Sequence, residues 1–213
     1  DLRQEIAASS PPRMLEEYYK ILRAGSALKT FRGLLDAGLL EPVTPELHER
    51  AGDPLWRSLA AVDAYRQKFS STPDTLTNAV LLGSLLVPIG LAPALGRPPL
   101  ADGERPRRPV GPRLGELPLA RRDLERLRQI LGLQRRLREL GASVRAQRAL
   151  THRNIFREAL TWLEIRGDAP EIVEHWITVL AERGAEEPVA NPAGDEAPRR
   201  RRRRRRRRFR PAH

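Results

Sequence analysis

The chain has 213 residues, of which 40% are apolar and 31% are charged, and none is cysteine. This length allows one or two hydrophobic cores. The lack of cysteine excludes a disulfide framework, a cysteine-ligated zinc site and a thiol nucleophile, and it fits a reducing cytoplasm. The first residue is Asp1 and no secretory signal precedes the first helical pattern, so we expect the chain to be a piece of a longer protein.

The formal net charge of +12 is distributed unevenly along the sequence. Residues 1–96 carry a net charge of −1, residues 97–153 carry +9, residues 154–198 carry −7 and residues 199–213 carry +11. Two strongly positive segments indicate a polyanionic partner, whose phosphates attract arginine. Only three of the 39 basic residues are lysines. Arginine suits bidentate phosphate contacts, although a GC-rich genome would produce the same bias.

The first 87 residues show helical periodicity. One helix is expected from Ser10, with Pro11 and Pro12 in its first turn, to Gly25, and a second from Ser26 to Gly38. Thr44 and Pro45 open a short turn. A third helix is expected from a cap at Asp53, with Phe69 as the last residue of its buried side. A fourth, apolar helix is expected to start at Thr72 and Pro73 and to end before Pro88.

Residues 75–96 carry no charge over a length that could span a bilayer. Pro88 and Pro93 interrupt this run, and its three glycines weaken it. We therefore expect a buried core helix of about 12 to 15 residues rather than a transmembrane segment.

Residues 88–118 hold eight prolines and predict a loop or linker. Helical patterns then return at 119–140, 142–150, from a cap at Thr151 to Gly167, and from Asp168 and Pro170 to Gly184, the last with Ile177 among its apolar residues. No convincing strand pattern occurs. The prediction is an all-α protein with a helical region at 1–87, the Pro-rich loop at 88–118, a second helical region at 119–184 and a disordered arginine-rich tail at 185–213.

The helix expected at 119–140 separates charge from apolar residues. At 100° per residue, five arginines fall within about 140° of one another, opposite Leu127, Ile130, Leu131 and Leu137. Together with three arginines that follow, this face predicts a groove that tracks a phosphate backbone of RNA or DNA; the alternative is an ordinary solvated helix face. The candidate residues are Arg121, Arg122, Arg128, Arg135, Arg136, Arg145, Arg148 and Arg153.

The tail contains ten consecutive arginines. Like charges at this density repel one another, so we expect disorder in the free protein and contacts to phosphates that do not read sequence. A nuclear address, a contact with acidic membranes and a low-complexity accident are the alternatives. These candidates are Arg199, Arg200, Arg201, Arg202, Arg203, Arg204, Arg205, Arg206, Arg207 and Arg208.

No catalytic or metal-binding pattern is found in the chain. The four histidines lack metal-ligand spacing, and none of the glycine-rich phosphate loops or nucleophile motifs occurs. Trp56, Trp162 and Trp176 sit at apolar helix positions, which favours core packing over base stacking. The isolated chain is therefore predicted to bind no metal and to be inactive.

Several groups of residues match the pattern of one known family. Near the start stand Ser10-Pro11-Pro12-Arg13-Met14-Leu15-Glu16-Glu17 with Lys20, Leu22 and Gly25; then come Leu34-Leu35-Asp36-Ala37-Gly38-Leu39-Leu40, and later Phe156-Arg157-Glu158-Ala159 with Leu163, Arg166 and Trp176. Together with the arginine-rich end, they resemble the carboxy-terminal half of bacterial poly(A) polymerases, relatives of the tRNA nucleotidyltransferases. The Pro-rich stretch departs from that pattern.

The resemblance implies an enzyme that adds AMP from ATP, with Mg²⁺, to RNA 3′ ends without a template in the cytoplasm. Its catalytic carboxylates, and with them ATP and Mg²⁺, would belong to an amino-terminal head that this chain lacks, so no catalytic residue is assigned. The expected partners are RNA 3′ ends and that head. Two alternatives remain open, namely a non-enzymatic basic RNA- or DNA-binding protein and the same region of a tRNA CCA-adding enzyme.

Overall fold

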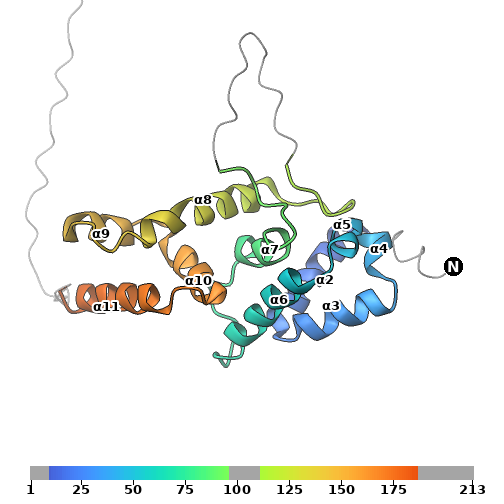
Figure 1. Cartoon of the computed structure of the whole chain (residues 1–213), viewed down its shortest axis with the longest axis horizontal. Coiled ribbons are helices and arrows are strands. Elements are labelled where there is room, and N and C mark those ends of the chain that lie inside the picture. Colours follow the sequence, from blue (N-terminus) through green and yellow to red (C-terminus); the bar gives the residue numbers. More distant parts are fainter. Residues whose placement is uncertain (1–9, 96–110, 187–213) are drawn as a thin grey trace, which may run out of the picture.

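The structure, a computed structural model, describes residues 10–95 and 111–186, and these residues form helices joined by turns and loops, with no strand among them. In Figure 1 the helices form an elongated body, with α2 to α6 at one end, α9 and α11 at the other, and α7 between them. The all-α prediction is confirmed for this part of the chain. The helices are α2 (Pro11–Ala24), α3 (Ala27–Asp36), α4 (Leu40–Val43), α5 (Pro45–Glu49), α6 (Asp53–Arg66), α7 (Asn78–Leu86), α8 (Arg121–Leu137), α9 (Val144–Thr151), α10 (Phe156–Arg166) and α11 (Pro170–Glu186).

The first helices are fixed by a turn and by a carboxylate from a later helix. Helix α2 ends at Gly25, which has a φ of 76°, a conformation that glycine adopts without strain. Ser26 precedes α3, but its side chain makes no capping bond. Instead, the backbone N–H groups of Ala27 and Leu28 donate to the carboxylate of Asp63 on α6, at 2.7 and 2.9 Å. This tertiary contact takes the place of a local cap.

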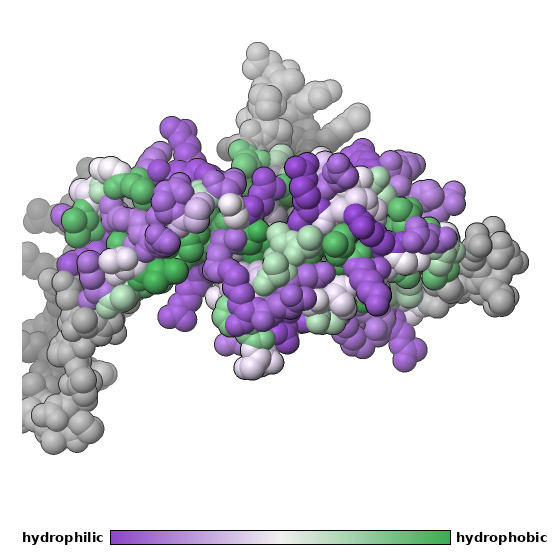
Figure 2. All heavy atoms as spheres, turned by 60° about the horizontal axis from the view of Figure 1, so that its bottom comes forward, coloured by the Kyte–Doolittle hydropathy of each residue, from purple (hydrophilic) through white to green (hydrophobic). Residues whose placement is uncertain are grey.

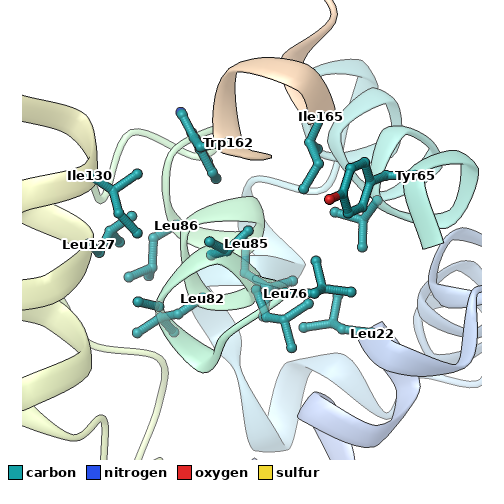
Figure 3. Packing of buried hydrophobic residues seen from close by; sticks show 14 of the residues in the cluster. Leu22, Tyr65, Leu76, Leu82, Leu85, Leu86, Leu127, Ile130, Trp162 and Ile165 are labelled. Atoms are coloured by element: carbon teal, nitrogen blue, oxygen red, sulfur yellow. The ribbon is translucent and has the colours of Figure 1, made fainter. Parts of the chain in front are cut away.

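Helix α7 is buried on all sides and joins the two ends of the body. A Cβ on its Gly83 would lie only 2.7 Å from Leu127 of α8 and from Trp162 of α10, so a larger residue there would push both helices away. Figure 3 shows Leu82, Leu85 and Leu86 of α7 among these neighbours. Helices from residues 10–95 and 111–186 thus share one hydrophobic core.

The far end of the body is organised around Trp176 of α11. Only 1% of this side chain is exposed. Its Nε1 donates to the carbonyl of Leu137 at 2.9 Å, and its ring meets that of Phe156 edge-on, with centroids 5.3 Å apart. The predictions of core positions for Trp162 and Trp176 are confirmed, whereas Trp56 is only partly buried.

Several expected helix boundaries were wrong. The third helix begins after Gly52, and α7 begins at Asn78 rather than at Pro73. Residue Thr151 ends α9 instead of capping α10, which starts at Phe156. Gly38, with a φ of 67°, terminates the second helix just after Asp36, as predicted. The four-residue helix α4 was not expected, since Pro42 lies in its middle.

Two residues expected in the core are exposed. Helix α6 ends at Arg66, so Phe69 lies beyond it, 40% exposed, and only its ring contact with Tyr65 remains. On α11, Ile177 is 54% exposed because the buried side of that helix passes through Val173 and Trp176. In the opposite direction, Leu133 of α8 is buried although the helical projection had not selected it.

The parts of the Pro-rich stretch that the structure describes pack against α5. Arg50 donates to the carbonyl of Ile89 at 2.6 Å, and the N–H of Gly115 donates to Glu46 at 2.7 Å. Leu114 and Leu117 are buried. In the described ranges no helix combines the length and the apolar character that crossing a membrane requires. The arginine-rich tail lies outside these ranges, apart from residues 185 and 186, which continue α11.

Candidate nucleic-acid interface

The two faces of helix α8 differ sharply in character. Leu127, Ile130 and Leu137 are fully buried, and Leu131 is half-buried, as the helical projection predicted. On the other side, the arginines selected from the sequence are all exposed, both on α8 and on the α9 segment that follows. This amphipathic arrangement leaves a basic surface over a rigid core helix.

Three surface hollows follow α8 and share lining residues. The first, about 610 Å³, is lined by Arg122, Gln129 and Asn154 among others. The second, about 490 Å³, also contains Gln129 and Asn154 and adds Arg128, Gly132, Arg136 and Arg153. The third, about 310 Å³, shares Arg136 and Arg153 and continues to α9 and Trp176. We call this series of adjoining hollows the α8 groove. It extends along α8, whose 17 residues span about 25 Å.

The middle of the α8 groove is basic and open. Arg128 and Arg136 come from α8, and Arg153 and Asn154 come from the turn between α9 and α10. Gly132 has no side chain, and no atom lies within 4 Å of where a Cβ would be. In the described part of the chain, the guanidinium groups of Arg136 and Arg153 have no ion pair or hydrogen bond, so both are available to an anion.

Three other arginines on the outer face pair with acids that lie within four residues of them in the sequence. Arg122 lies 3.5 Å from Asp123, and Arg135 lies 3.4 Å from Glu139. Arg128 makes a closer bidentate contact with Glu125, at 2.6 and 2.9 Å. Hydrogen bonds from Arg128, and a weaker one from Gln129, lower the pKa of Glu125 to about 2. The arginine of each pair is exposed, and ion pairs at a solvent-exposed arginine hold it weakly, so phosphate can compete for it.

The structure therefore brings only part of the predicted set together. Arg122, Arg128, Arg136 and Arg153 line the α8 groove. Arg121, Arg135, Arg145 and Arg148 are exposed near it without lining it. Gln129, Gly132 and Asn154 were not predicted, because the candidates were selected by charge alone. The one signal in the sequence that could have indicated this part of the groove is Gly132, which interrupts a basic helix.

Two arginines of the same region have a different role. Arg126 donates through Nε to Glu158 of α10 at 2.8 Å, and its Nη2 lies 2.5 Å from the other carboxylate oxygen. Thr77, just before α7, donates to the same carboxylate at 2.6 Å. Arg138 pairs with Asp168 at 2.9 Å. These contacts join α8 to other elements and serve the fold.

The amino-terminal helices offer a smaller basic surface. Arg13, Lys29 and Arg32 are exposed on α2 and α3. The guanidinium of Arg32 lies over the ring of Trp56, 5.6 Å from its centroid, which accounts for the partial exposure of this tryptophan.

No group of three or more His, Cys, Asp or Glu side chains that could hold a metal ion occurs within 10–95 and 111–186. The predicted RNA contacts of Arg199 to Arg208 lie outside the residues that the structure describes.

Two family models match the chain. Residues 1–50 match a model described as "probable RNA and SrmB-binding site of polymerase A", and residues 111–209 match one described as "polymerase A arginine-rich C-terminus". Together they cover well over half of the sequence. No curated protein and no solved structure gave a significant match. All RNA-binding candidates from the sequence fall within the second match, whereas the first description assigns RNA binding to a region where none had been selected.

Proposed function

The chain belongs to the poly(A) polymerase family, whose RNA-binding and arginine-rich carboxy-terminal regions it contains, and we propose that it is the RNA-holding part of a polynucleotide adenylyltransferase. In this proposal a catalytic head earlier in the same polypeptide binds ATP and Mg²⁺ and adds AMP to RNA 3′ ends. The present chain supplies the helical body and the contacts that keep the substrate in place. Its setting would be cytoplasmic mRNA polyadenylation, processing and decay.

The observation that carries the proposal is the pair Arg136 and Arg153 in the α8 groove. Both line two adjoining hollows, and neither has an ionic partner in the described ranges. A guanidinium group binds phosphate oxygens in bidentate fashion. Contacts to phosphates position a strand without reading its bases, which suits an enzyme that must accept many different 3′ ends.

The length of the groove supports a single strand as the ligand. About 25 Å of α8 corresponds to roughly seven stacked nucleotides at about 3.4 Å each. Arg122, Arg128 and Arg136 are spaced along this length, so one strand could meet them in succession. The region matched at residues 1–50 would provide a second contact, and Arg13, Lys29 and Arg32 are exposed cations in it.

The test is the double variant Arg136→Gln and Arg153→Gln in the full chain. We expect RNA affinity to fall about tenfold for every sequence tested, with the salt slope reduced by about 2, since two phosphate contacts are lost. Fluorescence anisotropy with labelled oligo(A) and a mixed-sequence RNA of equal length, over a series of salt concentrations, measures both quantities.

A charge-matched control is available in another hollow of similar size. Arg57 and Arg166 line a depression of about 320 Å³ between α6 and α10. The double variant Arg57→Gln and Arg166→Gln removes the same charge and should leave RNA affinity almost unchanged. Equal losses in the two double variants would show that only net charge matters, and would remove the groove from the proposal.

The enzymatic part of the proposal needs the longer protein. Incorporation of labelled ATP onto a short RNA primer with Mg²⁺ should occur with the full polypeptide and not with the 213-residue chain alone. Incorporation that stops after completing a CCA end on tRNA would favour the tRNA nucleotidyltransferase alternative. No incorporation by the longer protein would contradict the adenylyltransferase assignment.

The second candidate function, a non-enzymatic RNA- or DNA-binding protein, rests on the eleven arginines at 199–213. Deletion of these residues distinguishes the two. A protein that works through its tail alone should lose nearly all affinity, whereas the polymerase body should retain salt-sensitive binding through the α8 groove.

A further inference from the structure

The third hollow of the α8 groove is unlike the other two because most of its lining residues, five of nine, are apolar. Ala142, Ala146, Ala149 and Leu150 form its sides, and Trp176 lies at its floor. We propose that this hollow, the α9 pocket, holds one unpaired nucleobase of an RNA strand whose phosphates contact Arg136 and Arg153. The proposal rests on the proposed RNA-binding function and deepens it, since it assigns a base-binding site where none was predicted.

The floor of the α9 pocket is preorganised. Trp176 is held by its hydrogen bond to the Leu137 carbonyl at 2.9 Å and by edge contacts with Phe156 and His175, with ring centroids 5.3 and 5.4 Å apart. Since only 1% of Trp176 is exposed, it supports the pocket from beneath, and the apolar surface that a ligand would meet is mainly that of the alanines. Binding a flat apolar group there costs little ordering of the protein.

The amide side chain of Gln147, which lines the α9 pocket, is already occupied. The amide nitrogen of Gln147 donates to the carbonyls of Leu140 and Ala142, at 2.9 and 3.0 Å, and its oxygen lies 3.1 Å from Nε2 of His175. No amide group is left to read the edge of a base. A base would therefore bind through apolar contacts with the alanines, which every base can make.

The charges at the rim favour a nucleotide over an apolar peptide. Arg136 and Arg153 belong both to the α9 pocket and to the neighbouring hollow, so a phosphate bound between them places the attached base beside the alanines. The carboxylate of Glu139 stands at the same rim and repels phosphate. A phosphate is thus drawn toward the two arginines, and only the uncharged base is compatible with the remaining space.

Apolar side chains also gather at this end of the molecule. Figure 2 shows them between hydrophilic residues at the end formed by α9 and α11, and Val144 is 65% exposed there. A protein partner on this surface would be a different proposal, and the experiment below separates it from a base.

The experiment compares two polyanions, of which only one has bases. The probes are oligo(A) and inorganic polyphosphate with the same number of phosphates, and the variant is Ala146→Leu in the full chain. Leucine is a good helix former, and this position is exposed on α9, so we expect the fold to be kept. The larger side chain fills the α9 pocket, so oligo(A) should bind about tenfold more weakly while polyphosphate binds as before.

Two controls keep the outcome clear. Ala64→Leu makes the same change at an exposed position of α6 and should alter neither affinity. If the thermal unfolding midpoint of Ala146→Leu falls, Ala149→Leu fills the same pocket from the next turn of α9. In addition, RNA carrying 4-thiouridine should photo-cross-link to the peptide containing residues 142–150, and this cross-link should be lost in the pocket-filling variant.

The results that would reject the α9 pocket as a base-binding site differ from those that would reject the proposed function. If Ala146→Leu leaves both affinities unchanged, or lowers both equally, no base occupies the α9 pocket, although the arginine variants can still show that the groove binds phosphate. If Arg136→Gln and Arg153→Gln leave polyphosphate affinity unchanged, the phosphate-binding groove itself is rejected. An unaltered cross-link in the pocket-filling variant also overturns the inference.

Discussion

The inner and outer faces of helix α8 use the same residue type in opposite ways. On the inner side, Arg126 reaches Glu158 of α10, and at the end of the helix Arg138 reaches Asp168. On the outer side, Arg128 pairs only with Glu125 of its own helix, and Arg136 has no ionic partner within the described ranges. The position of the partner, more than the number of arginines, separates those that hold the fold together from those available to a ligand.

The amino-terminal helices show the same distinction. Arg66 of α6 donates to the carbonyl of Arg23 at 3.0 Å and to that of Phe69 at 2.7 Å. Arg23 in turn donates to Asn78 of α7, and Arg50 holds the carbonyl of Ile89. These arginines terminate helices and join elements. Counting basic residues therefore overestimates the binding surface unless such structural arginines are set aside.

The largest effect, on stability, is expected from removing the ion pair on the inner face of α8. Glu158→Ala removes a carboxylate that is only 3% exposed and that binds both Arg126 and Thr77. The free energy of unfolding should fall by about 2–3 kcal/mol, below the usual range for a buried pair because Arg126 is partly exposed. Urea denaturation measures this change. Glu125→Ala, which removes an exposed partner, should cost less than about 0.5 kcal/mol; equal losses would contradict the comparison.

Substitutions on the outer face of α8 should change stability less and RNA binding more. Gly132→Glu places a negative charge in the middle of the α8 groove, where a side chain has open space, and should weaken RNA binding about tenfold. Gly132→Ala should bind RNA normally and unfold with about 0.5–1 kcal/mol more free energy, since alanine is the better helix former. Reduced RNA affinity in the alanine variant would indicate that the groove depends on flexibility of α8 there.

The smallest effect is expected from releasing Arg128. Glu125→Gln removes the carboxylate that competes with phosphate for this guanidinium, so RNA should bind about two- to threefold more tightly. Because the pKa of Glu125 is lowered to about 2, its contribution to stability is present above its ordinary pKa and is lost only as the pH falls through about 2. Binding titrations from pH 5 to 8 should therefore show no transition from this group. A transition in that range that disappears in Glu125→Gln would refute the assignment.

Local signals in the sequence predicted much of the fold. Gly25 and Gly167 end their helices in the left-handed conformation, and Pro11 begins the first helix, since the constraints on these residues act within a few positions. The amphipathic pattern of α8 likewise predicted which leucines are buried. These features depend on short-range geometry that the sequence contains directly.

The errors share a long-range cause. Helix α7 begins five residues later than Pro73 suggested, after Thr77, whose hydroxyl is engaged by Glu158 from a distant part of the chain. The start of α3 is fixed by Asp63 instead of Ser26. Neither partner could be identified without knowing which helices are neighbours.

The candidate site was predicted in character but not in extent. The arginine face of α8 was found by helical projection, whereas the inclusion of Arg153 and Asn154 in the same groove depends on the turn between α9 and α10. The α9 pocket depends on the packing of Trp176 beneath α9. Such convergence of separate segments cannot be obtained from periodicity within one helix.

The short helix α5 has a consequence for how this family can diversify. Arg50 follows it and holds the chain at Ile89, and Glu46 within it holds the chain at Gly115. A Cβ on Gly115 would lie 2.2 Å from the carbonyl oxygen of Val43, so the returning strand of chain is seated against α4 and α5. Ile89 and Gly115 are thus both held beside α5. Replacing residues 96–110 with a flexible linker of half or twice that length should therefore change the free energy of loop closure by only about 0.6 kcal/mol. A change of loop length at this point should therefore leave the body that carries the groove undisturbed.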